Sequence, residues 1–174
     1  MTEGQRFLGK YRGTVVNNID PEQRGRLIVS VPDVLGPVPS TWAEPCAPLA
    51  GPTGPPMGVY MVPPIGAGVW VEFEHGDPDL PIWVGCRFGN AGEVPTLAFA
   101  GLPASPNIVL QTAGQNSIVV SDLPGPTGGI MLKSATGAML IVNDTGIYIE
   151  NGKGASIRLV GPTVDINNAA LSIT

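Results

Sequence analysis

The feature that most constrains this chain is a series of apolar doublets in its last third, residues 107–174. Each doublet consists of two apolar residues separated by one other residue, and glycine-rich or polar segments lie between successive doublets. Side chains two positions apart leave the same face of a strand, so each doublet predicts a strand of about three to five residues. No window of helical length has a period of 3.6, which argues against helix. The doublets are Ile108 and Leu110, Ile118 and Val120, Ile130 and Leu132, Leu140 and Val142, Ile147 and Ile149, Ile157 and Leu159, Val164 and Ile166, and Leu171 and Ile173.

A single copy of this segment is not expected to bury its doublets. A lone ribbon of short strands would expose its second face and both of its edges. Identical copies wrapped around a shared axis would place the doublets in one central core and would give each strand partners on neighbouring chains. We therefore expect a narrow, stiff needle built between chains. The alternative is an ordinary antiparallel meander packed on the N-terminal part of the chain.

The composition favours an assembled β protein. Only 13% of the residues are charged and 43% are hydrophobic, which leaves little surface for solvation. The 24 glycines and 19 prolines indicate many turns between regular apolar segments. The net charge of −5 argues against a nucleic-acid partner, because phosphate binding requires a basic face.

The sequence also bears on compartment and redox state. No apolar run reaches the length of a membrane span, and residues 1–10 do not have the pattern of a signal peptide. We therefore expect synthesis and assembly in the cytoplasm. Cys46 and Cys86 do not have metal-ligand spacing and are predicted to be buried free thiols.

The N-terminal half predicts a small barrel. Five short strands in about 80 residues, with glycine-marked corners, suggest a closed Greek-key barrel of the OB type. The clearest pair is a hairpin whose turn contains Gly76 and Pro78. The predicted strands are Leu8–Asn17, Gly25–Val31, Trp42–Ala47, Gly68–Glu74 and Pro81–Cys86, with a further short strand at Val59–Val62 inside the surface loop Pro48–Pro64. The expected organisation is an N-terminal arm (1–7), a barrel (8–89), a linker (90–106) and the needle (107–174).

Two runs in the barrel carry a family resemblance. The run from Gly68 to Gly85 resembles the OB-domain signature of central spike proteins of contractile injection systems, the phage baseplate assembly protein V and VgrG-type spikes. The earlier run from Gly13 to Pro32 matches the start of that domain. The residues of the hairpin motif are Gly76, Asp77, Pro78, Pro81 and Gly85.

This resemblance implies an all-β homotrimer with a structural function. The OB-fold barrels would form a collar on a hub protein at the end of the tail tube, and residues 107–174 would intertwine as a triple-stranded β-helix with the sixteen doublet residues in its core. Sheath contraction would drive this spike through the target envelope, with transient contact with the target membrane. The chain would be a baseplate component of a phage or phage-tail-like particle.

The resemblance also bears on partners. The chain lacks the hub-like region that precedes the barrel in VgrG proteins and the lysozyme domain of some phage spikes, so a separate hub is implied. The only histidine, His75, lies far from the C-terminus, so the His-x-His iron tip of some short spikes is absent. A PAAR-type tip protein is therefore expected to dock on the last six residues, Ala169, Ala170, Leu171, Ser172, Ile173 and Thr174.

Catalytic and metal chemistry are not predicted. His75 lies beside Glu74 and Asp77, but an exposed turn histidine is the simpler interpretation. Asp77 and Asp79 alone fall short of a calcium shell. Asp122, Asp144, Glu150 and Asp165 are spread among strands and turns, whereas glycan cleavage requires a carboxylate pair within about 5–10 Å. We therefore expect no enzyme, no cofactor and no metal; the alternative is a tail-associated glycan-degrading or receptor-binding β-helix protein. Trp42, Trp70 and Trp83 are expected to pack in a core or interface rather than to stack on bases.

Overall fold

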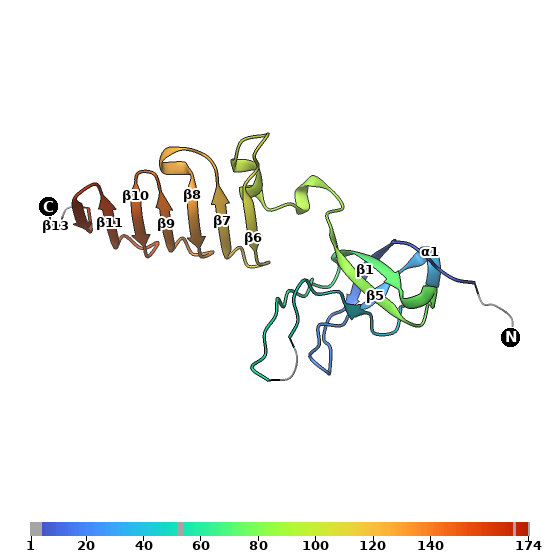
Figure 1. Ribbon diagram of the computed structural model, residues 1–174. Coiled ribbons are helices and arrows are strands. Elements are labelled where there is room, and N and C mark those ends of the chain that lie inside the picture. Colours follow the sequence, from blue (N-terminus) through green and yellow to red (C-terminus); the bar gives the residue numbers. More distant parts are fainter. Residues whose placement is uncertain (1–4, 52–53, 169, 174) are drawn as a thin grey trace. The chain divides into compact units, whose positions relative to one another are not determined.

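The computed structural model describes residues 5–51, 54–168 and 170–173. The chain forms two compact units that divide between Ala91 and Gly92. Both units are built mainly from β-strands (Figure 1), as the sequence predicted. No helix in these described residues is both long enough and apolar enough to cross a bilayer.

The N-terminal unit contains a five-stranded sheet in the order β2-β1-β4-β5-β3. All its neighbouring strands are antiparallel except β3 and β5, which are parallel. Isolated bridges from Leu27 to Ala43 and from Ser30 to Pro39 join the two edges of this sheet, so the barrel is only partly closed by regular strands. The elements are β1 (Tyr11–Asn17), β2 (Ile28–Ser30), α1 (Pro32–Leu35), β3 (Glu44–Pro45), β4 (Gly68–Phe73), η1 (Glu74–Gly76) and β5 (Pro81–Arg87), and η2 (Ala91–Glu93) spans the division between the units.

The core of this unit follows the period-2 pattern of its strands. Alternate residues of β4 are buried, as are the apolar residues that flank and fill β2. Phe7, Tyr11 and Phe73 form a cluster of aromatic rings with centroids 5.7–6.2 Å apart. The buried cluster is Val15, Leu27, Val29, Val31, Ala43, Val69, Val71, Phe73 and Trp83.

Several local expectations for this unit need correction. Val59–Val62 is not a strand, because this part of the loop pairs only through an isolated bridge between Ala50 and Gly58. The third strand is shorter than Trp42–Ala47, since only β3 pairs regularly with β5. Phe7, assigned to the arm, packs against the core, and its backbone N–H donates to the Gly76 carbonyl over 2.9 Å. Apolar ring burial holds this part of the arm in place.

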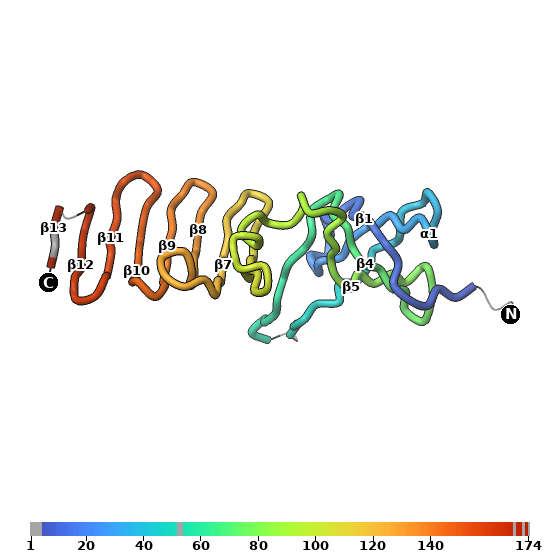
Figure 2. Tube along the Cα trace, turned by 90° about the horizontal axis from the view of Figure 1, so that it is seen from above, coloured from blue at the N-terminus to red at the C-terminus, as the bar shows by residue number. Residues whose placement is uncertain are grey.

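The C-terminal unit contains one eight-stranded antiparallel sheet in which strands follow one another in chain order from β6 to β13. Figure 2 shows the chain turning back and forth through these strands as a regular zigzag. The turns between strands are short, and short turns favour pairing of adjacent antiparallel segments. The elements are η3 (Thr96–Ala100), β6 (Ile108–Gln111), β7 (Ser117–Ser121), η4 (Gly125–Thr127), β8 (Gly129–Lys133), β9 (Met139–Asn143), β10 (Gly146–Glu150), β11 (Ser156–Val160), β12 (Thr163–Ile166) and β13 (Leu171–Ile173).

This pairing differs from the expected exchange of strands between chains. Each strand from β7 to β12 has both of its partners within the same chain. The backbone of the sheet is therefore satisfied without a second copy, and the order of strands is that of an antiparallel meander. The segment predicted as a linker also takes part in this unit, because η3 contacts β6 and the Asn107 side chain donates to the Leu97 carbonyl over 2.8 Å.

Candidate functional site

The sixteen doublet residues all lie on one face of the C-terminal sheet, which we name the front face. Strand register places them in two rows, each with one residue from every strand. The first row is Ile108, Val120, Ile130, Val142, Ile147, Leu159, Val164 and Ile173; the second is Leu110, Ile118, Leu132, Leu140, Ile149, Ile157, Ile166 and Leu171.

The front face is open in the single chain. Thirteen of its sixteen residues are exposed, from 37% for Ile147 to 69% for Ile108, and the other three are half-buried. Soluble monomers rarely expose a continuous apolar patch of this extent, and such patches mark interaction surfaces. The front face is therefore the strongest candidate functional surface of this unit.

The opposite face of the same sheet is different in character. Near β6 to β9 its central residues are apolar, and Val119 is only 3% exposed. Towards the C-terminus the cross-strand neighbours become Tyr148, Arg158 and Asp165. Arg158 lies 3.5 Å from the Glu150 carboxylate, an ion pair of the kind found on solvated sheet faces. The sheet thus has one apolar face and one face that becomes polar along its length.

Successive turns at the same end of the strands contact one another. The Asn116 Oδ1 accepts a hydrogen bond of 3.1 Å from the Ala135 N–H, which belongs to the next turn at that end of the strands. Further along, a Cβ added at Gly152 would lie 2.7 Å from the backbone carbon of Gly137, so only glycine permits this approach. The turns therefore join consecutive strands and also stack on one another at this end of the sheet.

The residues of the hairpin motif shape the N-terminal barrel. Gly76 is buried at φ +78°, and Asp77 Oδ1 accepts a 3.0 Å hydrogen bond from the Asp79 N–H. Pro81 is buried opposite Phe73 at the start of β5. Gly85, at φ +153°, follows an irregularity where β5 carries one residue more than β4. Each of these motif contacts fixes the turn or the bulge between β4 and β5.

The acidic residues considered for catalysis take part in structural hydrogen bonds. Asp122 accepts from the Ser105 hydroxyl over 2.8 Å, Asp144 accepts from the Gly125 N–H over 3.3 Å, and Glu150 pairs with Arg158. The His75 side chain is 86% exposed and lies 3.7 Å from Glu74, as expected of a turn histidine. The described residues contain no group of three or more side chains arranged to hold a metal ion.

The two cysteines correct one expectation. Both Cys46 and Cys86 are exposed free thiols rather than buried ones. Cys86 lies next to the last residue of β5, where its register partner is the buried Val69, and Cys46 lies just beyond the end of the edge strand β3. Partial burial still raises the pKa of the Cys86 thiol above its ordinary value.

The tryptophans pack on the barrel. Trp83 is 8% exposed, and its indole N–H donates to the Gly25 carbonyl over 3.0 Å. Trp42 is half-buried, with the Arg26 guanidinium 5.4 Å from its ring centre. Trp70, on β4, is also half-buried.

The proposed tip residues are described only in part. Ala169 and Thr174 lie outside the described residues, as does the side chain of Ser172. Ala170 is exposed, and Leu171 and Ile173 are the exposed β13 members of the two front-face rows.

The buried ion pair of Asp20 with Arg26 was not predicted from the sequence. Asp20 accepts hydrogen bonds from the backbone N–H groups of Glu22, Arg24 and Arg26, and also binds the Arg26 guanidinium over 2.7 Å. The Arg26 guanidinium, helped by these N–H groups, holds the pKa of Asp20 well below its usual range. The six-residue spacing between Asp20 and Arg26 gave no signal by itself, because the contact depends on how the intervening loop folds.

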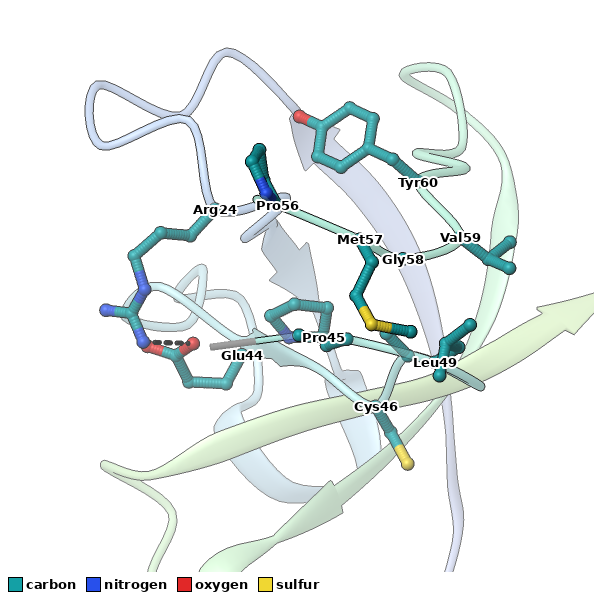
Figure 3. Close-up of a pocket in the computed structure, with 13 residues that line it drawn as sticks. Arg24, Glu44, Pro45, Cys46, Leu49, Pro56, Met57, Gly58, Val59 and Tyr60 are labelled. Carbon is teal, nitrogen blue, oxygen red and sulfur yellow. Dashed lines mark hydrogen bonds and ion pairs between the residues drawn. The ribbon is translucent and has the colours of Figure 1, made fainter. Parts of the chain in front are cut away.

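A groove on the barrel was also missed. It has a volume of about 690 Å³ and lies between the turn at Arg24 and the loop that follows β3. Figure 3 shows the Arg24–Glu44 ion pair on one side and Met57 beside the segment after β3 that carries Cys46. The available signal was the absence of charge from 45 to 71, which includes this loop.

Comparison with known protein families assigns both units. Residues 11–88 match the type VI secretion system/phage-baseplate injector OB domain. Residues 107–172 match the phage baseplate V C-terminal trimerisation domain. No curated protein matches the chain. The chain therefore matches an injector OB domain in its N-terminal unit and a baseplate V trimerisation domain in its C-terminal unit, and these two matches support a structural, trimeric component of a phage or type VI secretion baseplate.

Proposed function

We propose that this chain is the structural central spike of a contractile injection machine, and that three copies bury their front faces against one another. The observation that carries the proposal is the pair of eight-residue apolar rows, exposed in one chain and lying within a trimerisation domain. Three such faces around one axis remove most of this apolar surface from water, at roughly 25 cal/mol per Å². The three sheets would wind around this shared core as a triple-stranded β-helix in which the strands pair within each chain rather than between chains.

The work of such a needle is mechanical. Within each chain, unbroken strand pairing from β6 to β13 distributes force over many backbone hydrogen bonds. The stacked turns at Gly137 and Gly152 oppose sliding of one hairpin past the next. Burial of the front faces would add a continuous core between chains. This arrangement supports transmission of axial force without unravelling, and it requires no catalytic group.

The remaining proposed roles rest on the resemblance to central spike proteins. We propose that the OB barrels dock on a separate hub at the end of the tail tube, and that the end at Leu171 and Ile173 receives a PAAR-type tip protein. On sheath contraction the spike would pierce the target envelope and contact its membrane transiently. The protein would be made and assembled in the cytoplasm, as part of a phage or phage-tail-like particle.

The proposal is tested in particles assembled with altered spikes. Particles that carry Leu159→Asp on the front face should lose the spike or fail to puncture target cells, because a buried unpaired charge opposes trimer formation. Particles that carry Val160→Asp, on the opposite face, should contain the spike and puncture normally. Normal puncture by particles that contain no copy of this chain would contradict the spike function.

A further inference from the structure

The second surface that stands out is the long uncharged loop of the barrel. From 45 to 71 the sequence has no Asp, Glu, Lys, Arg or His. Several large apolar side chains of this stretch are nevertheless exposed, among them Met57, Tyr60, Met61 and Ile65. An uncharged, exposed apolar loop on a chain that is only 13% charged indicates a surface covered in the assembly.

One part of this loop forms a groove. The backbones of its two arms pair where Val59 N–H donates to the Leu49 carbonyl over 2.9 Å and Gly51 N–H donates to the Met57 carbonyl over 2.8 Å. This pairing presents the apolar side chains beside the exposed Cys46 (Figure 3). We define the groove by Cys46, Leu49, Met57, Val59 and Tyr60, with the Arg24–Glu44 ion pair on its rim.

A second group of exposed apolar side chains comes from the end of the same loop and from the end of β1 with its following turn. Asn18 donates to the Pro63 carbonyl over 3.0 Å, and Gly66 N–H donates to the Val15 carbonyl over 2.9 Å. These bonds hold the turn after β1 against residues 63–66. We define the ridge by its exposed members Val16, Ile19, Met61 and Ile65.

We infer that the ridge of one barrel packs into the groove of the next barrel in the trimer, closing a ring of three. This inference rests on the proposed homotrimer and assigns a second interface to it. Contacts around a threefold axis join two different patches on each copy, and this unit carries an apolar groove and a second group of exposed apolar residues, the ridge. An uncharged interface also fits contact between identical acidic chains, since it brings no like charges together.

The second copy is favoured as the occupant because the trimerisation domain follows in the same chain, from residue 107. Three barrels on short tethers experience an effective concentration of the order of millimolar. A weak apolar contact between them is populated at that concentration, although free barrels would not associate. The competing occupant of the groove is a hub protein. If the groove binds the hub instead of a second copy, it would be open in the purified trimer, which contains no hub.

The native cysteines provide a direct test in the unaltered full chain. Alkylation of Cys46 and Cys86 is followed by peptide mass spectrometry in the wild-type trimer and in the monomer produced by Leu159→Asp. Cys46 should react about tenfold more slowly in the trimer, because the neighbouring ridge covers it. Cys86, which lies outside the groove, should react equally in both. Equal Cys46 rates in trimer and monomer would overturn the inference.

Cross-linking gives a second test that does not depend on a monomeric variant. In full-length Cys86→Ser protein, Ile65→Cys places a thiol on the ridge while Cys46 remains in the groove. A short bismaleimide should join chains into covalent trimers, whereas Val38→Cys, equally exposed but outside both patches, should not. Products of single-chain size from the Ile65→Cys protein, while light scattering still reports a trimer, would overturn the inference, because the groove would then not hold the neighbouring ridge. A monomeric wild-type protein would instead refute the proposed function itself.

Discussion

Leu159 and Val160 are adjacent in β11 and almost equally exposed, at 38% and 43%, yet their side chains lie on opposite faces of the sheet. Leu159 belongs to a front-face row between Ile147 and Val164, whereas Val160 pairs with Thr163. Within one chain, the two side chains are therefore about equally accessible to solvent. Any large difference between equivalent substitutions at the two positions must arise from what covers the front face.

This pair gives the first prediction. Leu159→Asp should convert the protein to a monomer, because the carboxylate would be buried near the trimer axis without a partner. Val160→Asp should remain trimeric, with a change in stability of at most about 1 kcal/mol. Sedimentation of the two purified variants measures the difference. Trimers from both variants would show that the front face is not the interface.

The second prediction concerns the ion pair of Asp20 with Arg26. The folded state lowers the pKa of Asp20 below its ordinary value of 3.8, so the unfolded chain takes up the proton first as the pH falls. The stabilisation is thus complete above about pH 4 and is lost as the pH falls towards the lowered pKa. Thermal unfolding of the barrel between pH 7 and pH 2 should show this loss.

The Asp20→Asn variant separates this pair from other carboxylates. It should unfold at a lower temperature at pH 7, because Arg26 loses its charged partner, and its unfolding temperature should change less between pH 5 and pH 2. Asp33→Asn, at an exposed position in α1, serves as the control and should follow the wild-type curve. An Asp20→Asn curve parallel to the wild type would refute the role of the pair.

The barrel and the doublets differ in how far the sequence could predict them. In Gly68–Glu74 the alternation of the sequence puts Val69, Val71 and Phe73 on one face, and this face of β4 is the buried one, because local period alone decides which side chains share a face. The same rule placed the two residues of each doublet on one face of their strand, and the strand register then brings all sixteen to one face of the sheet. It could not determine which strands pair, because short strands pair equally well within a chain and between chains; the short turns favour pairing within the chain.

Features that depend on irregular backbone were the ones missed. The Arg26 side chain reaches Asp20 only because the loop between them folds back, and the groove beside Met57 requires two loop arms to pair. Cys86 was predicted to be buried, and the β5 bulge does pair it with the core residue Val69, yet its side chain is exposed near the end of the strand. A bulge shifts the alternation by one residue, and no local pattern announces it.

The third prediction tests the stacked turns. Gly152→Ala should destabilise the needle by more than Gly154→Ala, although both glycines have positive φ in the same turn. Gly154→Ala meets open space and should lose about 1–2 kcal/mol from backbone strain alone. Gly152→Ala must also displace the backbone near Gly137. Thermal unfolding of both variants measures the difference, and equal midpoints would mean that the turns do not support one another.

The central claim is that the front face is covered by two further copies of this chain. Light scattering on the purified, unaltered protein after size-exclusion chromatography measures this directly. The account predicts a single species of about 54 kDa, three times the 18.0 kDa chain, that persists on dilution. A monodisperse species of 18.0 kDa would contradict it, because the two apolar rows would then face water in the native protein.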